Sequence, residues 1–204
     1  MAVQPGEARL DTTSMISEDT FSREVTRAFG YLVRDFGYEL VQSDDYTVRF
    51  ERRPIFVTIG YDAVRSHEIS IWVGHGNDAE PPFELADVLR ATGCDQEYVD
   101  IVELMQTEDE VALARLLQRA GNLLRAHGTA FLRAAEKAFA NARGLRSGRA
   151  AEYTTRIQNR CVLEAADTAW MDRDYGRVHE LLNPIRASLG RTHRRRLDFV
   201  AKKL

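Results

Sequence analysis

The sequence predicts an α+β fold, in which an N-terminal helix packs on an antiparallel sheet of three or four strands and an all-helical C-terminal half follows. Two observations predict this class. Apolar and polar residues alternate from Tyr46 to Gly74, as they do in strands that bury one face. After residue 107, apolar residues recur at three- and four-residue spacing, as they do in helices that bury one side.

The N-terminal part is expected to hold a tail, one helix and a short strand. We expect residues 1–16 to form a flexible tail, because they lack both the basic start and the apolar centre of a secretory signal. Ser17 is a typical helix N-cap, and Gly37 predicts that this helix ends near Phe36. A short strand is expected over residues 38–41.

Three longer strands follow, and their registers can be predicted from the connections. Pairing Phe50 with Ile55 leaves four connecting residues, and pairing Tyr61 with His67 leaves five, which both suit hairpins. Both registers keep ten apolar residues on one face, as a buried face requires. These residues are Tyr46, Val48, Phe50, Ile55, Val57, Ile59, Tyr61, Ile69, Ile71 and Val73.

The opposite sheet face is the first candidate for function. The predicted registers place Phe56 opposite Trp72 and Arg49 opposite Phe56, an arrangement that favours a cation–π contact. One interpretation is that a later helix covers this face as a second small core. The other is a docking surface, because Trp, Phe and Arg are enriched at interface hot spots. The predicted partner-binding residues are Arg49, Phe56 and Trp72, with Asp62 and Arg65 at the hairpin edge.

The rest of the chain is predicted to be helical. Thr107 and Glu110 have the spacing of a capping box, so a helix is expected from there to His127, with Gly128 as its C-cap. The other expected helices cover residues 83–91, 96–105, 131–144, 148–171, 174–184 and 192–202. We therefore expect residues 17–107 to form an α+β unit and residues 108–204 a helical unit, and the two can also pack as one domain.

Composition excludes several classes of protein. The 204 residues are 44% hydrophobic and 29% charged, as in ordinary globular domains, and they contain no apolar run long enough to span a membrane. Cys94 and Cys161 belong to no CxxC or Cys/His cluster, which is typical of a reduced cytoplasmic protein. We expect no metal and no cofactor, since Walker, GxGxxG, GxSxG and HExxH motifs do not occur.

The charges are distributed unevenly along the chain. Residues 1–107 carry a net charge of −11, whereas residues 108–204 carry +8. Two halves of opposite net charge attract each other. They can pack together within one molecule, associate head to tail between copies, or leave a basic surface for an acidic partner.

Two further segments offer alternative functions. The hairpin loop of residues 61–68 gathers acid, base, hydroxyl and imidazole groups, so a small enzyme is one alternative, although alternation points His67 and Glu68 to opposite faces and no catalytic residue is assigned. The second alternative is a nucleic-acid-associated protein that uses the basic helix near the C-terminus. The basic residues there occupy successive helix positions, however, so they should wrap round the helix and not share one side of it. Its candidate residues are Arg191, Arg194, Arg195, Arg196, Lys202 and Lys203.

Two segments resemble known families. The order FGYELVQSDDYTVRFERRPIFVTIGYDAVRSHEISIWVG followed by PPFELADVLR resembles small bacterial α+β proteins of the immunity or defence-accessory type. This resemblance covers residues 20–105 and implies a non-enzymatic cytoplasmic protein that neutralises or scaffolds a partner protein. The segment AADTAWMDRDYGRVHELLNP, residues 165–184, resembles one helical hairpin of a tetratricopeptide-like repeat, which implies protein binding.

Overall fold

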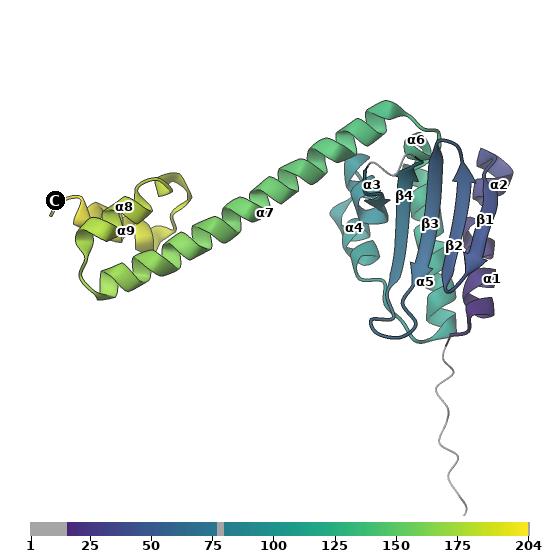
Figure 1. The fold of residues 1–204 in the computed structure, drawn as a ribbon, viewed down its shortest axis with the longest axis horizontal. Coiled ribbons are helices and arrows are strands. Elements are labelled where there is room, and N and C mark those ends of the chain that lie inside the picture. Colours follow the sequence, from purple (N-terminus) through teal and green to yellow (C-terminus); the bar gives the residue numbers. More distant parts are fainter. Residues whose placement is uncertain (1–15, 77–79, 204) are drawn as a thin grey trace, which may run out of the picture. The chain divides into compact units, whose positions relative to one another are not determined.

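The computed structural model in Figure 1 describes residues 16–76 and 80–203, and it has the predicted α+β fold. The chain forms two compact units, which divide at Gly144 and Leu145. This boundary differs from the division predicted at residues 107 and 108. Helices that follow residue 107 pack against the sheet and the first helix, and they belong to the sheet unit, called unit 1 here.

Unit 1 begins with helices and continues as a sheet flanked by further helices. Its elements are α1 (Glu18–Phe29), α2 (Tyr31–Phe36), β1 (Glu39–Asp44), β2 (Thr47–Arg52), β3 (Ile55–Tyr61), β4 (Ile69–His75), β5 (Phe83–Glu84), α3 (Leu85–Ala91), α4 (Gln96–Glu103), α5 (Glu110–His127), α6 (Thr129–Leu132) and the start of α7 (Glu136–Met171).

The sheet has five antiparallel strands in the order β1-β2-β3-β4-β5, so each strand pairs with its neighbour in the sequence. The prediction of three or four strands missed β5. This strand is two residues long, too short to produce an alternating pattern, and it forms only the pairs of Trp72 with Glu84 and Val73 with Phe83.

Both predicted registers are wrong by two residues. Phe50 pairs with Val57 rather than Ile55, because β2 continues to Arg52 and leaves only a two-residue connection. Tyr61 pairs with Ile69 rather than His67, since the loop between them is longer than expected. A slip of two residues keeps every side chain on its face, because the strand period is two. The assignment of residues to the two faces is therefore correct although their partners are not.

The predicted apolar face is buried against helices. Figure 1 shows α1 and α5 behind the sheet, and Phe21 of α1 stacks on Tyr61 of β3 with ring centroids 5.8 Å apart. Across this core the Tyr38 hydroxyl donates a hydrogen bond of 3.0 Å to the backbone oxygen of Leu132. Burial raises the pKa of Tyr38 well above its ordinary value.

The first helix has the predicted caps but an unexpected break. The Ser17 side chain accepts a hydrogen bond from the Thr20 amide, and Gly37 ends α2 in a left-handed conformation. Gly30 separates α1 from α2. Most of the predicted flexible tail, residues 1–15, lies outside the described residues, but Ile16 is buried and is not part of a tail.

The predicted capping box at the head of α5 is replaced by a different cap. Asp109 is the N-cap, and its carboxylate accepts a hydrogen bond of 2.7 Å from the Ala112 amide. The Thr107 hydroxyl instead accepts from the Asp109 amide at 3.0 Å. Thr107 therefore stabilises the turn before the helix, not the first turn of the helix.

Unit 2 contains the rest of α7, then α8 (Tyr175–Leu182), a short 3-10 helix (Arg186–Ser188) and α9 (Arg191–Val200). The predicted break at Gly144 is wrong, because α7 is continuous for 36 residues. Asp174 caps α8 as expected, by accepting from the Arg177 amide. A small apolar core holds this unit together; its buried residues are Ala166, Ala169, Val178, Leu182, Leu189, Leu197 and Val200.

Within residues 16–76 and 80–203, no helix combines the length and apolar character needed to cross a membrane.

Candidate functional site

The sheet face opposite the core carries the three residues predicted to bind a partner. Its middle row consists of Arg49, Thr58 and Trp72, and Phe56 lies one row away, opposite Gly74. The predicted direct pairs of Phe56 with Trp72 and with Arg49 are therefore absent. In Figure 1 the described helices of unit 1 that cover the sheet lie behind it, on the other side from this face.

Arg49 and Phe56 nevertheless make the expected cation–π contact, diagonally across the strands. The guanidinium carbon of Arg49 lies 3.9 Å from the centre of the Phe56 ring. Arg49 Nε also pairs with the Glu51 carboxylate at 2.7 Å, so its side chain is held from two sides. Both charged side chains stay about one third exposed, at 30% and 33%. The charges are thus fixed in place while still reaching solvent.

Two glycines allow the aromatic rings to lie close to the sheet. A Cβ atom on Gly74 would overlap the Phe56 ring, and one on Gly60 would meet the Trp72 ring at 3.1 Å. Phe56 is consequently buried, with 8% of its surface exposed, whereas Trp72 is half-buried. Of the two predicted aromatic contacts, Trp72 is the more accessible to a partner.

Thr58 lies between Arg49 and Trp72 in the same row. Its hydroxyl oxygen is buried and has no hydrogen-bond partner within the described residues. A hydroxyl that is covered by its neighbours and lacks a partner destabilises the free protein. Arg49, Phe56 and Trp72, which lie on the same sheet face on β2, β3 and β4, are called the layer here.

A hollow of about 440 Å³ adjoins this layer at the β2–β3 turn. Arg49, Glu51 and Phe56 form one side of it, and Arg53 and Pro54 of the turn form another. The sequence pattern did not predict this hollow, because it depends on the tight two-residue turn. The sheet face therefore combines an aromatic surface, charged groups of both signs and a concave edge.

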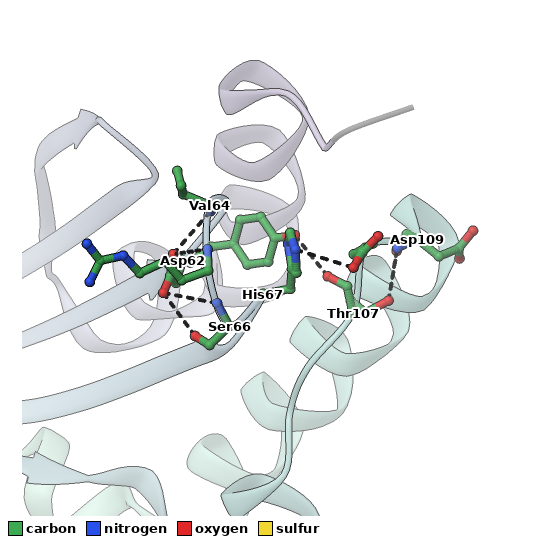
Figure 2. Close-up of polar contacts among 9 residues, drawn as sticks. Asp62, Val64, Ser66, His67, Thr107 and Asp109 are labelled. Atoms are coloured by element: carbon green, nitrogen blue, oxygen red, sulfur yellow. Dashed lines mark hydrogen bonds and ion pairs between the residues drawn. The ribbon is translucent and has the colours of Figure 1, made fainter. Parts of the chain in front are cut away.

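Asp62 and Arg65, the other predicted contact residues, lie in the β3–β4 loop shown in Figure 2. The Asp62 carboxylate accepts hydrogen bonds from the amides of Val64, Arg65 and Ser66 and from the Ser66 hydroxyl. These bonds lower the pKa of Asp62 to about 2, with the Arg65 amide as the largest cause. Asp62 therefore organises the loop, and the pKa of its carboxyl is too low for a proton acceptor near neutral pH.

His67 points away from Asp62, towards α5, as Figure 2 shows. Its Nδ1 atom lies 3.3 Å from the Tyr61 hydroxyl, and its Nε2 atom lies 3.3 Å from the Glu108 carboxylate. The Tyr61 hydroxyl also donates to the Thr107 oxygen at 2.9 Å. Burial is the main cause that raises the pKa of Tyr61. This network ties the loop to α5, and the sequence could not indicate it, because Glu108 lies far along the chain.

The basic residues of α9 separate into two groups. Arg196 and His193 both pair with Asp167 of α7, and Arg196 also lies over the Trp170 ring with its guanidinium carbon 5.2 Å from the ring centre. Burial raises the pKa of Asp167, but the hydrogen bonds from these two residues outweigh it, and the net shift is downward.

The other basic residues of α9, Arg191, Arg194 and Arg195, are exposed. At 100° per residue they share one side of the helix, opposite the buried Val200. The run therefore does not wrap evenly round α9 as predicted, because two of its members form contacts inside the unit.

Lys202 and Lys203 follow α9 and are exposed. The Lys203 Nζ atom lies 5.1 Å from the centre of the Phe199 ring and 5.6 Å from the centre of the Tyr175 ring. This lysine therefore lies against an aromatic cluster of unit 2.

No cluster of three or more His, Cys, Asp or Glu side chains suited to a metal ion occurs within the part of the chain that the structure describes. Comparisons of the chain with family models, with curated proteins and with solved structures found no match.

Proposed function

We propose that this chain is a non-enzymatic protein-binding module of the immunity or defence-accessory type, which neutralises or scaffolds a partner protein through the open sheet face of unit 1. The observation that carries the proposal is the layer formed by Arg49, Phe56 and Trp72. It lies on the sheet face away from the helices of unit 1, and its contacts are already formed in the free chain.

Preorganisation is what makes this layer suited to binding. Immobilising a flexible side chain in an interface costs about 0.5–1.5 kcal/mol, so side chains that are already fixed lose less on association. Arg49 is fixed by Phe56 and Glu51, and Phe56 is fixed by its close contact with Gly74. Trp72 offers the large half-buried ring typical of an interface anchor, and the neighbouring hollow offers a recess for a partner side chain.

The proposal is tested by capture from an extract of the native host with the immobilised full-length chain. The test variant combines Arg49→Glu and Trp72→Ala, which leaves the buried Phe56 in place. The matched control combines Arg133→Glu and Tyr153→Ala, an exposed arginine and an exposed aromatic residue elsewhere in the chain. Thermal unfolding of each protein shows whether its fold is intact.

The proposal predicts that the wild-type chain and the control retain the same protein and that the test variant loses it while still unfolding cooperatively. Retention of that protein by the folded test variant would overturn the proposal, and so would the absence of any specifically retained protein. Recovery of a second copy of this chain would identify self-association as the role of the face.

Nucleic-acid binding is the second candidate function, favoured by the exposed side of α9 that carries Arg191, Arg194 and Arg195. Such binding should weaken steeply as salt is added, because each phosphate contact releases counterions. Replacement of these three residues by Gln should abolish binding of a labelled DNA or RNA duplex, while Arg23→Gln on α1 should leave it unchanged. No binding by the wild-type chain at low salt excludes this candidate.

A further inference from the structure

A second surface of unit 1 lies along α5, on different elements from the sheet face. A groove of about 740 Å³ is lined there by residues of α1, α4 and α5. Its apolar lining includes two exposed side chains, Tyr98 at 37% and Val111 at 59%. Large apolar groups that remain this exposed beside a concave surface are typical of an interaction site.

The charged lining of this groove is entirely basic. Arg27, Arg115 and Arg119 line it, and no Asp or Glu does. This contrasts with the unit as a whole, since residues 1–144 hold 24 acidic and 15 basic residues. Arg27 is paired with Glu24 at 2.6 Å, but neither Arg115 nor Arg119 forms an ion pair within the described residues. The groove is thus a positively charged surface, suited to a negatively charged partner, on a unit whose net charge is negative.

The spacing of these groups matches a helix. Arg115 and Arg119 are four residues apart, so they point the same way about 6 Å apart along α5. The groove follows α5 from Val111 to His127, a length of about 24 Å, or between four and five helical turns. Carboxylates one turn apart on a partner helix would face both arginines while its apolar side lay on the groove floor.

The helices α1 and α5 pack closely beside the groove. A Cβ atom on Gly121 of α5 would lie 2.8 Å from the backbone oxygen of Ala28 on α1. A side chain at this position would push the two helices apart. A partner would therefore meet preformed walls, which lowers the entropic cost of binding.

From these observations we propose that the α5 groove binds an acidic amphipathic helix of a partner protein. Apolar side chains of that helix lie against Tyr98 and Val111, and its carboxylates pair with Arg115 and Arg119. Charge complementarity carries the choice of occupant, because the groove has an apolar floor and only basic charged groups. The site is independent of the proposed function of the sheet face.

The test uses a fluorescent peptide of about sixteen residues, with leucines at helical spacing and glutamates beside them, and measures its fluorescence anisotropy with the full-length chain. One control peptide has the same composition in scrambled order, and a second carries lysine in place of glutamate. The groove variant is Arg115→Glu with Arg119→Glu. The matched control is Arg34→Glu with Arg133→Glu, exposed positions outside the groove with the same change of charge.

We expect the acidic amphipathic peptide to bind and the groove variant to weaken its binding by about tenfold or more, since two charge pairs become repulsive. The control variant should change binding by less than about twofold. Trp72→Ala should also leave it unchanged, which separates this result from any failure of the sheet-face proposal.

The proposal is overturned if the acidic peptide does not bind, if the scrambled or lysine peptide binds equally well, or if the groove variant binds like the wild-type chain. Equal binding of the scrambled peptide would mean that the arginines recognise negative charge without a helix.

Discussion

The Arg49 guanidinium lies over the Phe56 ring, with its carbon 3.9 Å from the ring centre, although the two residues are not paired across β2 and β3. Arg49 is opposite Thr58, and Phe56 is opposite Glu51. The contact therefore crosses the strands diagonally. It joins two rows of the sheet face into one layer.

The Arg49→Met variant should lower the free energy of unfolding by about 0.5–1 kcal/mol, because it keeps the apolar stem but loses the cation–π contact. The pair with Glu51 is lost at the same time. Arg53→Met is the control, since Arg53 is exposed and lies at the adjacent turn. Urea unfolding measures the free energy of unfolding of both variants. Equal stabilities would contradict a stabilising role for the contact.

Gly74→Ala should destabilise the protein by about 1–3 kcal/mol, because the new Cβ atom would overlap the Phe56 ring and force it off the sheet. Gly60→Ala is the matched control on the same face. There the nearest atom is the edge of the Trp72 ring at 3.1 Å, which can move slightly, so the stability should change by less than about 1 kcal/mol. Thermal unfolding compares the two. Equal losses would show that Phe56 is not held by Gly74.

Thr58→Val should stabilise the free protein by about 1 kcal/mol, because it removes a buried hydroxyl that has no hydrogen-bond partner among the described residues. Valine keeps the β-branched shape that suits a strand. Thr47→Val, at the half-buried end of β2, serves as the comparison. Destabilisation by Thr58→Val would contradict an unsatisfied hydroxyl at this position.

The Asp62 carboxyl should titrate at a pKa of about 2, below its ordinary value of 3.8. Since the folded state lowers this pKa, the carboxylate contributes stability above the ordinary value, and that contribution is lost as the pH falls through about 2. The Asp62→Asn variant should lose this part of the acid dependence. NMR titration of the carboxyl carbon and urea unfolding at several pH values test it, and a pKa near the ordinary value would contradict the hydrogen bonding shown in Figure 2.

Gly144→Ala and Gly148→Ala should each stabilise α7 by about 1 kcal/mol, because alanine favours helix and a Cβ atom at either position meets open space. Gly121→Ala in α5 should have the opposite effect, since its Cβ atom would meet the backbone of α1. Circular dichroism during thermal unfolding shows whether each variant is more or less stable than the wild-type chain. A loss of stability in the first two variants would mean that α7 is not continuous there.

The strand pattern predicted the two sheet faces, whereas it could not predict the registers. Alternation depends only on the local sequence, and a slip of two residues leaves it unchanged. The assignment of Arg49, Phe56 and Trp72 to one face is therefore correct. The register depends on the turns. The Asp62 carboxylate closes its loop through backbone amides, and a list of residue types does not show that geometry.

Helix ends were predicted correctly at several caps, including Gly37, but wrongly at Gly144 and at the start of α5. Ser17 and Asp174 cap their helices as expected. Gly144 was expected to end a helix, but glycine is tolerated inside one at a modest cost when neighbouring residues favour helix. The α5 groove was not predicted at all, because Arg27, Tyr98 and Arg115 come together only through packing of three separate helices.

Fluorine NMR of Trp72 tests most directly whether the sheet face of unit 1 binds a partner. Trp72 and Trp170 are the only tryptophans, so a Trp170→Phe chain grown with fluorotryptophan gives one resonance, which an unlabelled partner cannot obscure. We expect a soluble paramagnetic probe to broaden this resonance in the free full-length chain, and the captured partner to protect it. A resonance already shielded in the free chain, or one that stays equally accessible with the partner bound, would contradict a binding role for the sheet face.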